Sequence, residues 1–194
     1  MTTVADANVH NIAVRGNFDD CQKILKDLFA NARFRERVRL SGVNSINWGR
    51  IVAQIVYYFT AAVSLGAPHR PVTFVVPTGN FGDILAGYSA KRMGLPIEKL
   101  VIATNANDIL ARTLETGRYE VAGVTPTSSP SMDIQVSSNF ERLLFEALGR
   151  DAEGLQRLMQ GLAQSGGFSV PAGALEAIRG DFAAGRADEQ ATRD

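Results

Sequence analysis

Cysteine and histidine are scarce in this chain of 194 residues, and its charges of opposite sign balance. The single cysteine, Cys21, excludes an internal disulfide and suits a reducing compartment such as the cytoplasm. The two histidines, His10 and His69, are too far apart in sequence for an obvious metal cluster. Lys plus Arg and Asp plus Glu number 20 each. This balance argues against a nucleic-acid binder, because such proteins need a basic face.

Long apolar segments are also missing. The most apolar run, residues 51–65, is interrupted by Gln54, Thr60 and Ser64 and is too short to cross a bilayer. Residues 1–10 lack the basic segment and apolar core of a signal peptide. Hydrophobic residues make up 45% of the chain and charged residues 21%, which is typical of a globular protein in water. We therefore expect a cytoplasmic protein with no membrane span and no bound metal.

Alternating strand and helix patterns predict an α/β fold. Residues 71–76 and 100–104 are apolar runs typical of buried parallel strands. Helical patterns follow each of them, over 84–93 and 109–114, and a long, mostly buried helix is expected over 46–65. This order implies an open, mainly parallel sheet with right-handed crossovers and flanking helices.

The two ends of the chain show other patterns. Residues 9–14 read as a strand, Asn17 as the cap of a following helix, and the charged stretch 33–39 as a solvated face or loop. From about residue 132 onward the chain is expected to be mostly helical, with no obvious strand. The helices expected there cover residues 138–148, 152–164 and 172–185.

The most informative stretch is residues 74–83, which predicts a buried strand, a tight glycine turn and a helix start. Such a turn points backbone N–H groups and the positive end of a helix dipole at one spot, where an anion binds. Glycines at both ends let the backbone approach the ligand without a Cβ in the way. A plain turn without a ligand is the alternative. The candidate phosphate-binding residues are Gly79, Asn80, Phe81, Gly82 and Asp83.

Asp83 is unexpected in this turn, because a carboxylate beside a phosphate is repulsive at short range. Either its side chain points away and caps helix N–H groups, or it contacts the phosphate through water.

Residues 44–50 form a second candidate anion site. Asn44, Ser45 and Asn47 offer neutral donors near a predicted helix start. Arg50 lies one turn beyond Asn47 and carries a forked guanidinium suited to phosphate. The alternative is that Asn44 or Ser45 is a plain helix cap and Arg50 a surface charge.

The turn Pro77-Thr78-Gly79-Asn80-Phe81-Gly82-Asp83 resembles the phosphate loop of threonine synthases, which are pyridoxal-phosphate enzymes of fold type II. Residues 8–22, 44–50 and 131–142 resemble further segments of that family in the same order. The resemblance implies conversion of O-phospho-L-homoserine and water to L-threonine and phosphate. It also implies that the turn holds the phosphate of pyridoxal phosphate and that Asn44, Ser45, Asn47 and Arg50 contact the substrate.

One part of the resembled family is absent from the sequence. Its Schiff-base lysine lies in a Phe-Lys-Asp-like segment, and no lysine here has that setting. We therefore expect an internal fragment without activity of its own, in which 1–43 is a remnant of the smaller domain and 44–194 is part of the large cofactor-binding domain. The alternative is a non-catalytic module that binds a phosphorylated ligand or a partner. The lysines present are Lys23, Lys26, Lys91 and Lys99.

Overall fold

The computed structural model describes residues 4–16, 18–42 and 44–193. It divides the chain into two compact units, Met1–Gly42 and Val43–Asp194, which are considered separately. The first unit contains helices α1 (Phe18–Ala30) and α2 (Ala32–Val38). In the described part of the chain, no helix combines the length and the apolar character needed to cross a membrane.

Before α1 the structure departs from the sequence prediction. Residues 9–14 form no strand, so the strand predicted there is wrong. A strand is stabilised by pairing with neighbours, and the strands of both sheets come from the second unit. The charged stretch 33–39 lies mostly in α2, whose residues are all exposed. The proposed cap, Asn17, lies outside the described residues.

Helix α3 (Trp48–Ser64) is less buried than the sequence predicts. Asn47 caps its first turn, accepting a hydrogen bond from the Gly49 N–H at 2.9 Å. One face packs against the core, but the outer face exposes apolar side chains, so the predicted burial is correct for one face only. The buried residues are Ile51, Tyr58 and Ala62, and the exposed ones include Val52, Val56 and Val63.

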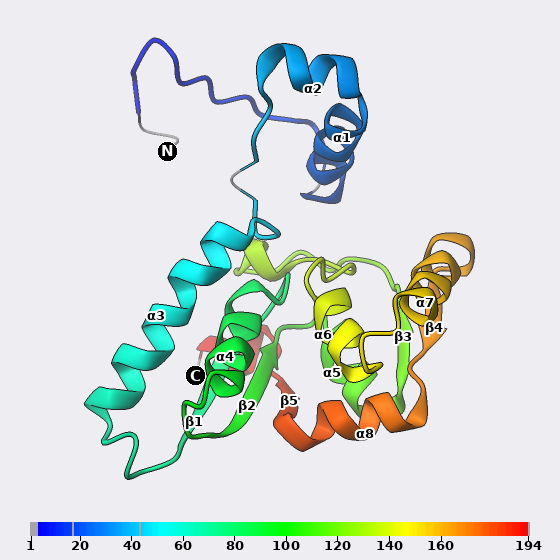
Figure 1. The fold of residues 1–194 in the computed structure, drawn as a ribbon. Coiled ribbons are helices and arrows are strands. Elements are labelled where there is room, and N and C mark those ends of the chain that lie inside the picture. Colours follow the sequence, from blue (N-terminus) through cyan, green and yellow to red (C-terminus); the bar gives the residue numbers. More distant parts are fainter. Residues whose placement is uncertain (1–3, 17, 43, 194) are drawn as a thin grey trace. The chain divides into compact units, whose positions relative to one another are not determined.

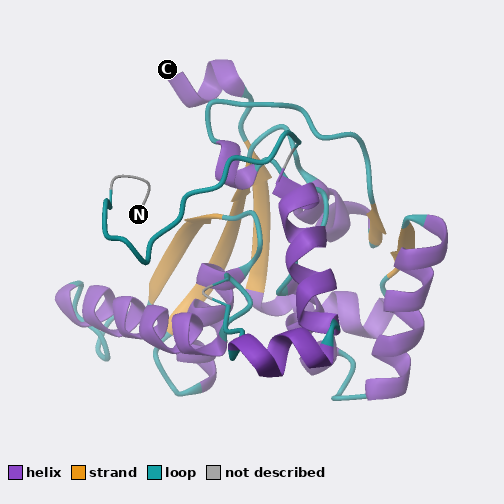
Figure 2. Cartoon of the chain, turned by 90° about the horizontal axis from the view of Figure 1, so that it is seen from above, coloured by secondary structure: helices purple, strands orange, loops and turns teal. Residues whose placement is uncertain are grey.

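The larger sheet of the second unit contains parallel strands in the order β1–β2–β5. Helix α4 (Gly82–Arg92) connects β1 (Val72–Pro77) to β2 (Ile97–Thr104), and helix α5 (Ile109–Thr116) follows β2 (Figure 1). Seen from above, the strands lie side by side among the helices (Figure 2). The predicted α/β fold with an open parallel sheet and flanking helices is confirmed.

Strand β5 (Phe182–Arg186) corrects the prediction of a purely helical C-terminal part. Helix α8 (Ala172–Asp181) stops earlier than expected, and the next residues pair with β2, with Ala183 opposite Val101. The sequence Phe-Ala-Ala-Gly-Arg has little intrinsic preference for a strand. The free edge of β2 therefore determines the conformation of this segment.

A second, smaller sheet pairs β3 (Arg118–Glu120) antiparallel with β4 (Gly167–Ser169), neither of which the sequence predicts. Helices α6 (Phe140–Ala147) and α7 (Ala152–Ser165) lie where helices were expected. The remaining elements are the 3-10 helix η1 (Pro130–Met132) and helix α9 (Glu189–Arg193).

Aromatic rings pack together between these elements. Tyr119 stacks on Phe140, with ring centroids 5.4 Å apart, and on Phe168, at 4.9 Å. Phe81, from the turn between β1 and α4, contacts the rings of Phe140 and Phe182 at 5.6 Å each. Aromatic pairs at these spacings contribute beyond the area they bury. The cluster thus ties the turn to α6 and β5.

Candidate functional site

The turn between β1 and α4 has an unusual backbone. The Thr78 N–H donates to the Ala103 carbonyl at 2.8 Å as β1 ends. Phe81 then takes a φ of 63°, in the left-handed region that bulky residues rarely adopt. Its side chain is only 1% exposed. Burial of the ring holds the backbone in a conformation that would otherwise cost free energy, as is common at ligand sites.

The carbonyl groups of this turn are occupied by hydrogen bonds from elsewhere in the unit. The Ser137 hydroxyl donates to the Gly79 carbonyl at 2.8 Å. The Asn80 carbonyl accepts from the backbone N–H of Asn139 at 3.1 Å and from its Nδ2 at 2.9 Å. The Phe81 carbonyl accepts from the Leu85 N–H within the first turn of α4.

The donors of the turn have no such partners. Within the described residues, the backbone N–H groups of residues 80–83 donate to no protein acceptor. They lie at the start of α4, an 11-residue helix whose dipole places positive charge at this end. A turn with satisfied acceptors and free donors binds an anion. The geometry therefore fits the phosphate group that the sequence predicts for Gly79–Asp83.

Asp83 has a partner that neither sequence alternative names. Its carboxylate accepts a hydrogen bond from the Tyr58 hydroxyl of α3 at 3.1 Å. Burial first, and then the nearby carboxylate, raise the pKa of Tyr58 well above its usual value, so the hydroxyl stays protonated and keeps donating. Gly87 leaves room for that ring, because a Cβ there would lie 2.6 Å from Tyr58 Cε1.

Residues 44–50 adopt local capping arrangements. The Asn44 side-chain oxygen accepts from the Ser45 hydroxyl and from the Ile46 N–H, at 3.1 Å each. Asn47 is the cap of α3, and Arg50 is exposed on the first turn. The helix cap is thus Asn47 rather than Asn44 or Ser45. A role of these residues toward a substrate stays a prediction.

Ser45 lies next to the turn 79–83. A Cβ on Gly82 would be 3.4 Å from the Ser45 carbonyl oxygen and 3.9 Å from Ser45 Cβ. The structure therefore brings the second candidate segment to the first, although 37 positions separate these two residues in the sequence. Glycine at position 82 permits this close approach.

Residues 137–139 support the turn 79–83 by hydrogen bonds, a role that the sequence does not predict. Ser137 and Asn139 bond the loop carbonyls as described, and the Ser138 hydroxyl donates to the Asn80 side-chain oxygen at 3.1 Å. These residues belong to the stretch that resembles the family. The resemblance therefore marks these residues, but their role depends on hydrogen bonds to residues 58 positions away in the sequence.

Asp133 organises the loops that follow β2. Its carboxylate accepts from the side chains of Asn105 (2.8 Å) and Asn107 (3.0 Å). It also accepts from the Thr127 N–H (2.8 Å) and hydroxyl (2.7 Å). Burial alone would raise the pKa of Asp133, but these hydrogen bonds outweigh burial and hold the pKa below its ordinary value of 3.8. The segment that packs on Gly79 is therefore fixed by a charged acceptor.

Asp133→Asn is expected to lower the free energy of unfolding at neutral pH by on the order of 2 kcal/mol, since a charged acceptor is lost from buried donors. The folded-state pKa of Asp133 is depressed, so its stabilisation exists above pH 3.8 and disappears as pH falls through the folded-state value. Urea unfolding at pH 7 and near pH 3 should therefore show the gap between wild type and variant narrowing in acid. Glu176→Gln, at an exposed position, is the control. An equal difference in the free energy of unfolding at both pH values would contradict the role given to the Asp133 carboxylate.

The lysines of the second unit are engaged away from the loop. Lys91 forms an ion pair with Asp181 at 2.7 Å. Lys99 donates to the carbonyls of Arg179 and Gly180 at 3.1 and 2.9 Å. Both lysines lie near the amino end of β2, whereas the loop follows the carboxyl end of β1. In the first unit, Lys23 pairs with Asp27.

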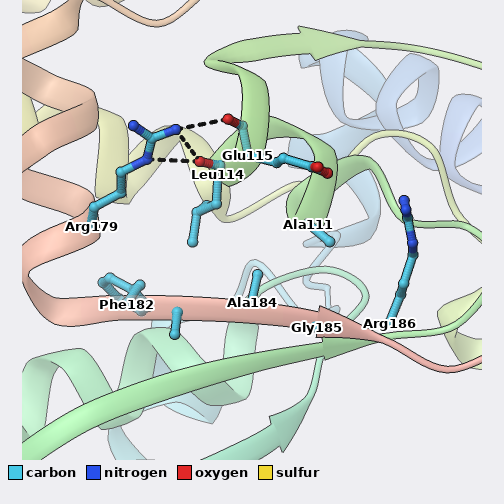
Figure 3. Close-up of a pocket in the computed structure, with 9 residues that line it drawn as sticks. Ala111, Leu114, Glu115, Arg179, Phe182, Ala184, Gly185 and Arg186 are labelled. Atoms are coloured by element: carbon cyan, nitrogen blue, oxygen red, sulfur yellow. Dashed lines mark hydrogen bonds between the residues drawn. The ribbon is translucent and has the colours of Figure 1, made fainter.

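A separate cavity of about 320 Å³ lies between α5, α8 and β5 (Figure 3). Its main cation, Arg179, donates to the carbonyls of Leu114 and Glu115 and so caps the C-terminal end of α5. Arg186, at its other end, pairs with Asp108 at 2.6 Å. Both guanidinium groups that line this cavity are therefore bonded to groups of the protein.

Comparison with known proteins shows similarity to threonine synthases. No protein-family model matches the chain. It is 58% identical over 170 residues to a threonine synthase of Pseudomonas aeruginosa, covering 88% of this chain and 36% of that protein. It is 48% identical to a threonine synthase of Saccharomyces cerevisiae, covering 99% of this chain and 40% of that protein.

Solved structures agree. A pyridoxal-phosphate-bound threonine synthase from Brucella melitensis superposes with a TM-score of 0.88 at 65% identity, covering 96% of this chain and 40% of that one. The yeast threonine synthase superposes with a TM-score of 0.85 at 46% identity, covering 98% of this chain and 39% of that one. The chain is thus homologous to threonine synthases along almost all of its length and spans about 40% of theirs. The resemblance seen in four short segments is confirmed.

Proposed function

We propose that this chain forms the cofactor-phosphate cradle and an adjoining part of the substrate site of a threonine synthase. The complete enzyme would convert O-phospho-L-homoserine and water to L-threonine and phosphate with pyridoxal phosphate, on a fold of type II, in the cytoplasm. The carrying observation is the turn 79–83, with its carbonyls bonded and its N–H groups free, in a chain homologous to threonine synthases.

In this proposal the residues of the chain bind and orient. The N–H groups of residues 80–83 and the dipole of α4 hold the cofactor phosphate. Asn44, Ser45, Asn47 and Arg50 contact the phosphate of the substrate. When bound, the cofactor supplies an electron sink for the negative charge that develops on the substrate. Residues 44–194 would be part of the large cofactor-binding domain, and 1–43 part of the smaller one.

The lysine that holds the cofactor covalently would come from outside the second unit as described. Lys91 and Lys99 are bonded near the amino end of β2, so neither is placed to form a Schiff base with a cofactor held at the turn 79–83. No lysine of the sequence, Lys23 and Lys26 included, has the Phe-Lys-Asp-like setting of the family's Schiff-base lysine. The chain by itself should therefore hold the cofactor through its phosphate alone and make no threonine.

A binding experiment with the purified chain tests the cradle. Pyridoxal phosphate should be retained, and inorganic phosphate should displace it, because the contacts are to the phosphate. Pyridoxal, which lacks the phosphate, is the matched control and should not be retained. After dialysis has removed unbound and loosely bound cofactor, borohydride should fix no cofactor to the protein. Equal retention of both compounds would contradict the cradle, and a fixed adduct would contradict the lysine argument.

A chimera tests the activity. The homologous segment of the Pseudomonas aeruginosa threonine synthase, 58% identical over 170 residues, is replaced by this chain. We expect the chimera to produce threonine from O-phosphohomoserine. A chimera that binds pyridoxal phosphate but makes no threonine would favour the non-catalytic phosphate-binding module instead.

A further inference from the structure

Asn139 connects two segments that are distant in sequence. It is fully buried, with 0% of its surface exposed. Its Nδ2 donates to the Asn80 carbonyl at 2.9 Å and to the Ser45 carbonyl at 3.1 Å. An amide nitrogen carries two hydrogens, so each carbonyl takes one. The backbone N–H of Asn139 adds a second bond to Asn80.

These bonds set the direction of the donors on the other side of each peptide. A trans peptide is planar, with its C=O and N–H pointing in opposite directions. The Asn80 carbonyl shares a peptide with the Phe81 N–H, which is one of the free donors of the turn. The Ser45 carbonyl likewise shares a peptide with the Ile46 N–H. Holding both carbonyls from one amide therefore fixes the orientation of both peptides.

The junction has little room to adjust. A Cβ on Gly82 would lie 3.4 Å from the Ser45 carbonyl oxygen and 3.5 Å from Asn139 Nδ2. Arg142, one turn further along α6, adds a bond from Nη2 to the Ile46 carbonyl at 2.8 Å. Asn139 Oδ1 is buried and accepts no hydrogen bond from the described residues. The Asn139 side chain therefore acts at this junction through its Nδ2 donors and not through its oxygen.

We propose that Asn139 is a positioning residue that holds the cofactor-phosphate loop and the segment 44–50 at a fixed spacing, so that phosphate bound at the loop is sensed by the second segment. This inference rests on the proposed function, because it takes the loop as the phosphate site. It adds a role for a residue that touches neither phosphate itself.

The test is an amide-resolved NMR titration of the chain with inorganic phosphate. Phe81 reports on the loop, and Ile46 and the indole of Trp48, the only tryptophan, report on the second segment. In the wild type, both sets of signals should follow one binding curve. In Asn139→Ala, phosphate affinity should fall by about tenfold, the effect of one lost hydrogen bond. The signals of Ile46 and Trp48 should no longer follow the loop.

Gln135→Ala is the matched control. Gln135 also carries a buried side-chain amide, which donates from Nε2 to the Gly123 carbonyl and accepts from the Ala122 N–H, and so bonds neither the turn nor Asp133. This variant should keep the coupled response and the wild-type affinity. The proposal is overturned if Asn139→Ala keeps the wild-type affinity, or if Ile46 and Trp48 still follow the loop in that variant.

Two ligand-free readouts separate this inference from the proposed function. If phosphate fails to bind the wild type, the cradle is wrong, but the Phe81 and Ile46 amide signals of Asn139→Ala should still shift together relative to those of Gln135→Ala. If Asn139→Ala does not fold, hydrogen exchange of the Asn139 side-chain amide in the wild type tests the proposal instead. Its protons should exchange slowly with solvent, and exchange as fast as in an exposed asparagine would overturn the proposal.

Discussion

Replacing Phe81 by alanine is expected to lower the free energy of unfolding of the second unit by about 3–5 kcal/mol, the usual range for a buried phenylalanine. The ring is 1% exposed and contacts Phe140 and Phe182. Its loss leaves a cavity where the turn, α6 and β5 meet. Urea unfolding followed by Trp48 fluorescence measures the effect, because the only tryptophan lies in this unit.

Phe81→Gly separates packing from backbone strain. Both variants lose the ring, but glycine adopts the observed φ of 63° freely. The glycine variant should therefore be at least as stable as the alanine variant, against the normal destabilising effect of glycine. A loss below about 1 kcal/mol in Phe81→Ala would contradict the packing argument, which predicts a large cavity effect. A glycine variant clearly less stable than alanine would contradict the strain argument.

Gly79→Ala is expected to abolish retention of pyridoxal phosphate and to destabilise the unit by about 1–3 kcal/mol, as overpacking does. A Cβ at this position would lie 3.0 Å from the Ser131 carbonyl oxygen and 3.3 Å from Met132 Cα. Both are backbone atoms, and Asp133 anchors the segment that carries them. The loop must therefore move, and its N–H groups lose their common direction.

Gly173→Ala is the matched control for this substitution. It lies in α8, where a Cβ would meet nothing within 4 Å. Alanine there should leave the stability unchanged or slightly raised, because alanine favours a helix, and cofactor retention should be unchanged. Retention of pyridoxal phosphate by Gly79→Ala at the wild-type level would show that the turn is not the phosphate site. Equal losses of pyridoxal phosphate retention in Gly79→Ala and Gly173→Ala would point to a general effect on folding.

The sequence by itself determined the central β1–turn–α4–β2 unit. Its signals are local: a run of β-branched residues, two glycines around the turn and a helical pattern that ends at Gly94. These features specify strand, turn and helix through contacts between near neighbours. They also located the candidate loop at Gly79–Asp83, and the order of strands and helices was sufficient for the α/β class.

The tertiary structure alone decided the elements whose partners lie far along the chain. Phe182–Arg186 is a strand because β2 offers a free edge, while residues 9–14, despite a favourable pattern, form none. The same reason explains the site. The free donors of the turn depend on Ser137 and Asn139 occupying its carbonyls, and the approach of Ser45 depends on Asn139 and Gly82. Hydrogen bonds between residues 58 or 94 positions apart leave no periodic trace in a sequence, because local conformational preference extends over only a few residues.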